Sequence, residues 1–205
     1  MVPEEVKIHR LFPTCVFEFR LPNHEVANAR WAEKIIELHT GSRDLHLFQT
    51  GNNLHELEAF SALTDHIHKA ARTVLETLDA TYQEIAITGC WANIQRKNST
   101  FNVHSHPNSF LSGVYYVKTP ANSGKIVFKK RIVNDIVPLF KQPNELNEAL
   151  HKCAPEAGMM LLFPSWLEHY VERNGSDESR ISISFNLMFR GLLGSNPTLT
   201  TVYFD

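Results

Sequence analysis

Three histidines carry the clearest chemical signal in the sequence. His104 and His106 stand two residues apart in Asn-Val-His-Ser-His-Pro, and on a strand that spacing points both side chains to one face. His169 follows 63 positions after His106, behind the apolar run and turn Leu-Leu-Phe-Pro-Ser-Trp. An isolated His-x-His pair is more often two exposed loop residues, and a single later histidine is more often a packed core residue. If the three imidazoles converge, they instead form a site for iron or zinc.

A second signal is the alternation along residues 180–186, Arg-Ile-Ser-Ile-Ser-Phe-Asn. On a strand, Arg180, Ser182, Ser184 and Asn186 share one face, and the apolar residues share the other. A solvent-facing strand would show the same pattern. In a barrel, however, the polar face can line a pocket. There the planar guanidinium of Arg180 would bind a carboxylate, and Ser182 would add a hydrogen bond.

The segments around these groups indicate a mainly β protein. They are short, rich in β-branched and aromatic residues, and separated by turn residues. We predict strands over 11–21, 84–96, 110–118, 124–133, 159–163, 168–172 and 180–189.

Two helices are predicted before the main series of strands. The first contains Trp31, Ile35 and Leu38 at helical spacing, and the second runs from about 55 to 79. Residues 134–157 interrupt the strands and are expected to hold a short helix over Asn144–Lys152; this insertion is a candidate active-site lid. The inferred architecture is two helices packed on a β-sandwich or barrel.

Composition limits the classes of partner. The chain has 205 residues, 43% hydrophobic and 20% charged, with a formal charge of −2, which fits one globular domain. This charge balance argues against binding nucleic acid or membrane by bulk electrostatics. Three widely spaced cysteines without a Cys-x-x-Cys motif favour a reducing compartment, and the acidic N-terminus is unlike a signal peptide, so a cytoplasmic location is expected.

Taken together, these residues resemble the iron- and 2-oxoglutarate-dependent oxygenases. Members of that superfamily carry His-x-Asp/Glu near a strand end, a distal His, and an Arg-x-Ser about ten residues later. Here Arg180 follows His169 by eleven positions, and Ser182 completes the motif. Two phrases look like those of a subgroup of small oxygenases from bacteria and phages: His-Ser-His-Pro-Asn-Ser-Phe-Leu-Ser-Gly-Val-Tyr-Tyr-Val and Phe-Pro-Ser-Trp-Leu-Glu-His-Tyr-Val.

The resemblance implies a double-stranded β-helix (jelly roll, cupin-like) backed by N-terminal helices. A single domain would span 1–205. Its parts would be an N-terminal strand and supporting helices over 1–83, the jelly-roll core over 84–190, and a C-terminal tail over 191–205.

The resemblance also implies roles for individual residues. His104, His106 and His169 would bind Fe(II). The remote carboxylate of the co-substrate 2-oxoglutarate would pair with Arg180 and accept a hydrogen bond from Ser182. Tyr116, the second of a Tyr-Tyr pair, would touch the same carboxylate. Asn93 lies between Trp91 and Gln95 on an inward-facing strand and would contact the co-substrate or the substrate. For Trp91, core packing is favoured.

This sequence departs from the family pattern at position 106, where His replaces the carboxylate. A three-His iron site would keep a formal charge of +2 rather than +1, which favours an anionic co-substrate. Alternatively, His106 is the first ligand and Asn108 takes the carboxylate's place. A third reading is a site that holds zinc, because three His and a water form a good zinc centre, or a site that has lost oxygenase chemistry.

Three functions remain open from the sequence. The first is a hydroxylase that converts 2-oxoglutarate to succinate, with no catalytic residue beyond the metal centre and a small-molecule or peptidyl substrate. The second is another cupin-like metalloenzyme, such as a three-His dioxygenase or a zinc hydrolase, with Arg180 turned away. The third is a non-catalytic jelly-roll binding module. An exposed helix face would allow a homodimer, although no sequence feature demands one.

Overall fold

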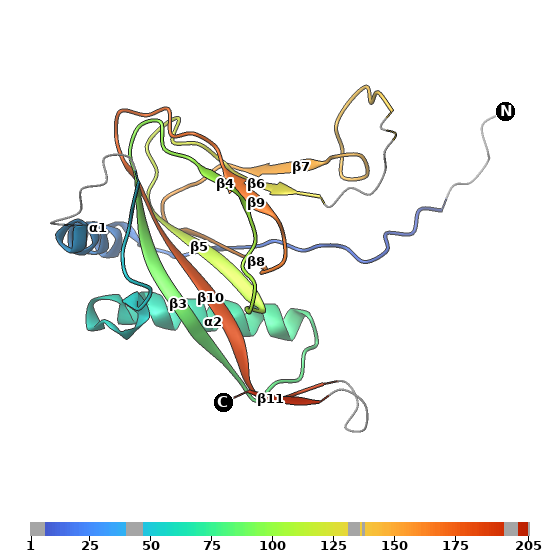
Figure 1. Ribbon diagram of the computed structural model, residues 1–205, viewed down its shortest axis with the longest axis horizontal. Coiled ribbons are helices and arrows are strands. Elements are labelled where there is room, and N and C mark those ends of the chain that lie inside the picture. The colour runs from blue at the N-terminus through green and yellow to red at the C-terminus, as the bar shows by residue number, and fades with distance from the viewer. Residues whose placement is uncertain (1–6, 40–46, 131–135, 137, 195–200, 205) are drawn as a thin grey trace.

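Two antiparallel sheets and two α-helices make up the computed structural model, which describes residues 7–39, 47–130, 136, 138–194 and 201–204 (Figure 1). In the large sheet the strand order is β1 (Phe17–Arg20), β8 (Met159–Pro164), β5 (Leu111–Lys118), β10 (Arg180–Leu193), β3 (Glu84–Gln95) and β2 (Leu47–Gln49). The far end of β10 also pairs with β11 (Val202–Phe204). The order in the small sheet is β4 (Phe101–His104), β9 (His169–Val171), β6 (Ile126–Lys129) and β7 (Leu150–Cys153).

The two faces of the large sheet pack against different partners. Alternate residues along β10, from Ile181 to Leu187, join the main core with helices α1 (Glu25–His39) and α2 (Ser61–Thr77). The residues between them point to the other face, where Tyr116 of β5 lies in a second core with the small sheet. Because strand side chains alternate with a period of two, each central strand serves both layers. One layer is apolar, and the other encloses the polar groups described below.

A buried polar contact ties helix α1 to the large sheet. Asn28 donates from Nδ2 to the Val117 carbonyl at 3.0 Å and accepts from the Tyr115 hydroxyl at 2.7 Å. Trp31 packs edge-on against Tyr115, with ring centroids 5.6 Å apart, and its Nε1 donates to the Ala59 carbonyl at 2.9 Å. The helix is therefore fixed by hydrogen bonds as well as by apolar burial. In Figure 1, α1 and α2 lie against the large sheet and away from the strands of the small sheet.

The structure confirms most of the predicted strands and corrects several boundaries. The strand predicted over 11–21 is shorter, because only Phe17–Arg20 pairs with β8. Two 3₁₀ turns, Leu54–Glu56 and Glu58–Phe60, precede α2, so the second helix begins later than predicted.

The helix predicted over Asn144–Lys152 is wrong. Residues 145–147 form a turn, and Leu150–Cys153 pair with β6 as the edge strand β7. Part of the insertion 134–157, and the end of the strand predicted over 124–133, lie outside the described residues. Among the described helices, none is both long and apolar enough to cross a membrane.

Candidate active site

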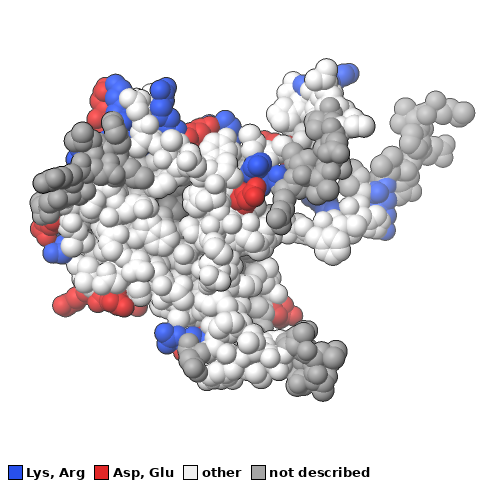
Figure 2. All heavy atoms as spheres, viewed as in Figure 1, with Lys and Arg blue, Asp and Glu red and all other residues white. Residues whose placement is uncertain are grey.

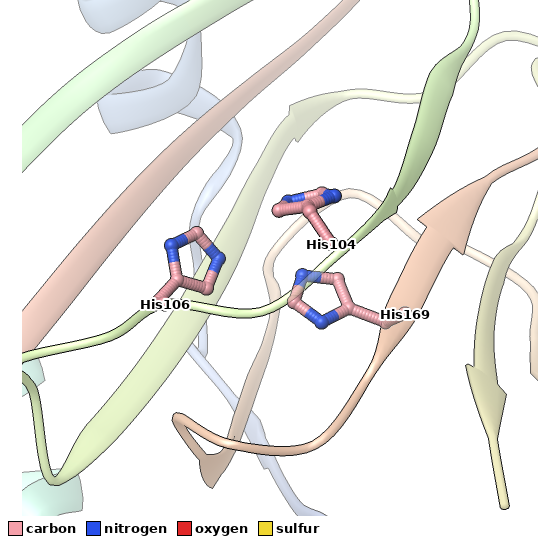
Figure 3. Close-up of side chains that lie close together, drawn as sticks. All are labelled: His104, His106 and His169. Carbon is pink, nitrogen blue, oxygen red and sulfur yellow. The ribbon is translucent and has the colours of Figure 1, made fainter. Parts of the chain in front are cut away.

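Three histidines, two on adjacent strands and one on a loop, converge in space (Figure 3). His104 ends β4 and stands opposite His169, the first residue of β9, in the antiparallel register, while His106 lies in the loop after β4. One ring nitrogen from each of the three lies within 4.8 Å of the others, and the ring centroids of His104 and His169 are 4.4 Å apart. The predicted cluster is therefore assembled, and its donors are close enough to share one metal ion.

Backbone carbonyls orient two of the imidazoles. His104 Nδ1 lies 2.7 Å from the Asn102 carbonyl, and His169 Nδ1 lies 2.8 Å from the Leu167 carbonyl. A carbonyl only accepts, so Nδ1 carries the proton in both rings and Nε2 keeps a free lone pair. This arrangement is typical of metal-binding histidines, whose second nitrogen is hydrogen-bonded.

Burial keeps two of the three histidines in their neutral form. The loss of hydration, with a smaller contribution from the neighbouring histidines, lowers the pKa of His106 to about 4 and that of His169 to about 4. The ring of His169 also packs edge-on against Phe163, with centroids 4.8 Å apart. At neutral pH these imidazoles are therefore unprotonated and ready to act as ligands.

The loop that carries His106 is bound to the turn before β9. The backbone N–H of His106 donates to the Ser165 carbonyl at 2.9 Å, and the Ser165 hydroxyl donates to the Ser109 carbonyl. The N–H of Ser165 in turn donates to the Phe110 carbonyl at 3.1 Å. These bonds explain how a residue outside any strand reaches the same point as His104 and His169.

Arg180 is a buried cation without a carboxylate partner in the described part of the chain. It is 2% exposed, and it donates to the carbonyls of Ser123 (3.3 Å) and Gly124 (3.1 Å) and to Oε1 of Gln95. All three acceptors are neutral. Burial lowers the pKa of Arg180, but an arginine stays charged in proteins. An uncompensated guanidinium at this depth calls for an anionic ligand.

The other predicted co-substrate residues lie in one row across three strands. Ser182 of β10 stands opposite Asn93 on β3 and opposite Tyr116 on β5, so the three side chains share a face. Burial raises the pKa of the Tyr116 hydroxyl, which therefore remains a hydrogen-bond donor. The Asn93 amide accepts from Gln49 at 2.8 Å and donates to Ser184 at 3.0 Å. The row forms one polar wall beside Arg180.

A cavity of about 470 Å³ between the two sheets joins the histidines to this wall. Its lining contains all seven predicted site residues, His104, His106, His169, Arg180, Ser182, Tyr116 and Asn93. Among the described lining residues, Arg180 is the only Lys, Arg, Asp or Glu. On the face shown in Figure 2, charged side chains gather mainly toward the periphery, and the surface over the middle of the large sheet is nearly free of them.

Three placements differ from the sequence analysis or extend it. Trp91 lines the cavity, with its ring 6.0 Å from that of His106, so the favoured core assignment was wrong. Asn108 is exposed in a turn, with φ of 63°, and is not part of the cavity lining. The sequence gives no role to Gln95, which is only a near neighbour of Asn93 there. In the structure Gln95 stands opposite Arg180 in the pairing of β3 with β10. This strand pairing would have identified Gln95, but it cannot be read from the sequence.

Part of the sequence matches a known protein family. Residues 89–186 match the sequence profile of the family described as "Putative 2OG-Fe(II) oxygenase". No curated protein matches the sequence.

Several solved structures share the fold. An oxidoreductase of the 2OG-Fe(II) oxygenase family from Burkholderia pseudomallei is 17% identical, with a TM-score of 0.59 over 83% of this chain and 84% of that one. A Pseudomonas putida prolyl-4-hydroxylase is 16% identical, with a TM-score of 0.58 over 87% and 89%. HygX from Streptomyces hygroscopicus, with nickel, 2-oxoglutarate and hygromycin B bound, is 13% identical, with a TM-score of 0.60 over 85% and 83%.

These likenesses confirm the predicted jelly-roll fold, since the solved oxygenases superpose over most of the chain. The family match covers the segment that supplies every residue of the histidine cluster and of the polar wall around Arg180 and Ser182. Residues 89–186 thus match the sequence profile of this family, and the chain shares the fold of a solved 2OG-Fe(II) oxygenase.

Proposed function

We propose that this protein is an Fe(II)- and 2-oxoglutarate-dependent dioxygenase that hydroxylates a C–H bond of a small-molecule or peptidyl substrate. The overall reaction consumes the substrate, 2-oxoglutarate and O₂, and it yields the hydroxylated substrate, succinate and CO₂. The observation that carries the proposal is the pairing, in one cavity, of a three-histidine cluster with the buried, uncompensated cation Arg180.

The residues present fit an iron ion. His104, His106 and His169 offer three imidazole nitrogen donors within 4.8 Å of one another, and imidazole suits Fe(II). Bound iron would supply the activation of O₂ and the oxidative chemistry. Three protein ligands leave coordination positions for other molecules, as such chemistry requires. Because none of the three carries a negative charge, an anionic co-substrate is favoured.

The protein's own residues would orient 2-oxoglutarate. The Arg180 guanidinium would pair with the remote carboxylate, and the hydroxyls of Ser182 and Tyr116 would donate to the same group. Asn93 would contribute to the wall beside it, where its amide is already held by Gln49 and Ser184. The apolar part of the lining, including Phe163 and Val114, would exclude water from the reacting atoms.

The relatives support both substrate classes. The Streptomyces hygroscopicus structure holds the small molecule hygromycin B, and the Pseudomonas putida relative is a prolyl-4-hydroxylase. A zinc hydrolase or another cupin-like enzyme is less well supported. That hypothesis expects Arg180 to point away from the histidines, whereas it lines the same cavity.

An anaerobic titration tests the proposal. Metal-free protein is titrated with Fe(II) and then with 2-oxoglutarate while the visible absorbance is recorded. We expect a weak metal-to-ligand charge-transfer band that requires both additions and is lost in Arg180→Ala. Metal binding without the band would favour a different metalloenzyme, and no metal binding would contradict the proposal.

A further inference from the structure

We propose that Gln95 is a positioning residue that orients Arg180 while leaving its positive charge free for the co-substrate. The inference rests on the proposed function, because it concerns how the remote carboxylate of 2-oxoglutarate is recognised. It assigns a role to a fully buried residue outside the motif that carries the family resemblance.

The contacts of Gln95 leave it little freedom. Its Oε1 accepts from Nη2 of Arg180, its directly paired residue on β10. Its backbone carbonyl accepts from Asn174 Nδ2 at 2.9 Å, and the same Asn174 group donates to the Glu178 carbonyl at 3.0 Å. The strand end that carries Gln95 is thus tied to the turn that leads into β10. Both partners of the side-chain contact therefore have fixed backbones.

The guanidinium also determines which end of the Gln95 amide faces it. Arginine has only donors, so the amide oxygen must point to Nη2. The amide nitrogen, Nε2, is buried without a partner in the described part of the chain, and so is Nε of Arg180. Leaving a buried donor unsatisfied costs free energy. That cost is tolerated here at a point where Arg180 opens onto the cavity.

Neutrality is the feature that distinguishes Gln95 from the usual partner of a buried arginine. Buried charges are normally paired. A Glu at position 95 would have nearly the same shape and would keep an oxygen on Nη2, but it would form an internal ion pair with Arg180. The carboxylate of 2-oxoglutarate would then have to compete with an internal carboxylate. Glutamine holds the guanidinium in place without neutralising it.

The test compares Gln95→Glu with the wild-type protein in the anaerobic Fe(II) titration, with 2-oxoglutarate as the probe. We expect the Kd for 2-oxoglutarate to rise about 30-fold or more, since a charge-assisted contact is lost. Binding of Fe(II) should not change. A second probe, 2-oxobutanoate, keeps the 2-oxo acid group but lacks the remote carboxylate. We expect 2-oxobutanoate to bind more weakly than 2-oxoglutarate, with the same Kd in the wild type and in Gln95→Glu. A general distortion of the site would instead raise the Kd for both probes.

Two further variants make the comparison specific. Gln83→Glu makes the same substitution at an exposed position just before β3, where its oxygen accepts from the Leu192 N–H, and it should leave the Kd unchanged. Gln95→Met removes the acceptor without adding charge and should raise the Kd for 2-oxoglutarate by about 3- to 10-fold. If Gln95→Glu does not fold, as judged by near-UV circular dichroism, the methionine variant decides.

The outcomes separate the two proposals. A wild-type protein without the 2-oxoglutarate-dependent band overturns the proposed function and this assignment with it. A normal wild-type band overturns only the role of Gln95 if Gln95→Glu binds 2-oxoglutarate as tightly as the wild type. The role of Gln95 would also be overturned if Gln95→Glu lost 2-oxobutanoate binding as strongly as 2-oxoglutarate binding. An unchanged Kd for 2-oxoglutarate in Gln95→Met would overturn it as well.

Discussion

Tyr115 and Tyr116 are neighbours in the chain, but their side chains lie on opposite faces of the large sheet. The hydroxyl of Tyr115 donates to Asn28 of α1, whereas Tyr116 lines the cavity. We therefore expect Tyr116→Phe to weaken 2-oxoglutarate binding about 3- to 10-fold and to leave the melting temperature nearly unchanged. Tyr115→Phe should lower the free energy of unfolding by about 1 kcal/mol without affecting 2-oxoglutarate binding.

Each tyrosine variant is the control for the other. Co-substrate binding is followed by the charge-transfer band, and stability by urea denaturation. If both substitutions weakened binding equally, the assignment of Tyr116 to the co-substrate site would be contradicted, because Tyr116 lines the cavity and Tyr115 does not.

The low pKa values of His106 and His169 predict an acid-sensitive metal-free protein. Both values fall from 6.5 to about 4 on folding. Between these pH values the unfolded state therefore binds more protons than the folded state, and stability is lost as the pH falls from 6.5 toward 4. Above pH 6.5 both states are neutral at these positions, so their contribution no longer changes. Urea denaturation of the metal-free protein at several pH values measures this slope.

A matched variant isolates the contribution of the cluster. His66 and His68 on α2 also have lowered pKa values, chiefly because of partial burial. They therefore also make the free energy of unfolding decrease as the pH falls. The double variant His106→Gln, His169→Gln should therefore show a shallower, but not flat, dependence on pH. An identical slope in the wild type and the double variant would show that the two buried rings are not the cause.

At the scale of elements, the turn before β6 holds Arg180, the proposed partner of 2-oxoglutarate, through its backbone. Gly124 has φ of +82° and its carbonyl accepts from Arg180, while a Cβ there would collide with the backbone oxygen of Glu172. We expect Gly124→Ala to destabilise the fold by about 1–3 kcal/mol and to weaken 2-oxoglutarate binding. Gly89→Ala is the control, because its Cβ would meet only an ordinary contact at 3.7 Å. Equal urea midpoints for the two variants would contradict this account.

The strands and helices that could be predicted from the sequence are those whose own polar and apolar residues alternate with the period of the element. β10 alternates polar and apolar residues because it separates two layers, and the predicted strand over 180–189 lies entirely within it. By contrast, β2 and β11 have three residues each and are held by their partners β3 and β10. β7 is largely exposed and pairs only with β6. Elements that depend on a distant partner carry little local signal.

The same distinction applies within the site. The motif residues from His104 to Ser182 could be selected because type and spacing together indicate metal and carboxylate binding. Gln95 and Trp91 could not be assigned, because their environment depends on which strand lies beside β3 and on which face meets the small sheet. Strand register is a tertiary property, and a shift of one residue would reverse both side chains.

For the whole molecule, the layered arrangement separates stability from binding. The helices and the outer face of the large sheet form the main apolar core, while the cavity lies on the other face. Trp31 belongs to that core and is 3% exposed. Trp31→Ala should therefore cost about 3–5 kcal/mol of stability without changing the Kd for 2-oxoglutarate in the protein that remains folded. A changed Kd would show that the two layers are coupled.

Ligand binding should in turn stabilise the whole fold, because the histidines that form the cluster come from segments far apart in the chain and meet only in the folded state. A ligand that binds only the folded state at 100 times its Kd adds about 2.7 kcal/mol. For a chain of this size, that corresponds to a rise of roughly 5–11 °C in melting temperature.

Nickel(II) is a suitable redox-stable probe, since nickel and 2-oxoglutarate occupy the Streptomyces hygroscopicus relative. We expect nickel to raise the melting temperature by one increment. We expect 2-oxoglutarate to raise it by a second increment, which appears only when nickel is present. His169→Ala should abolish both increments, whereas Arg180→Ala should abolish only the second, because His169 would hold the metal and Arg180 would hold the remote carboxylate of 2-oxoglutarate. A second increment that survives in Arg180→Ala would mean that the co-substrate is held without the guanidinium, and the assignment of its remote carboxylate to Arg180 would have to be abandoned.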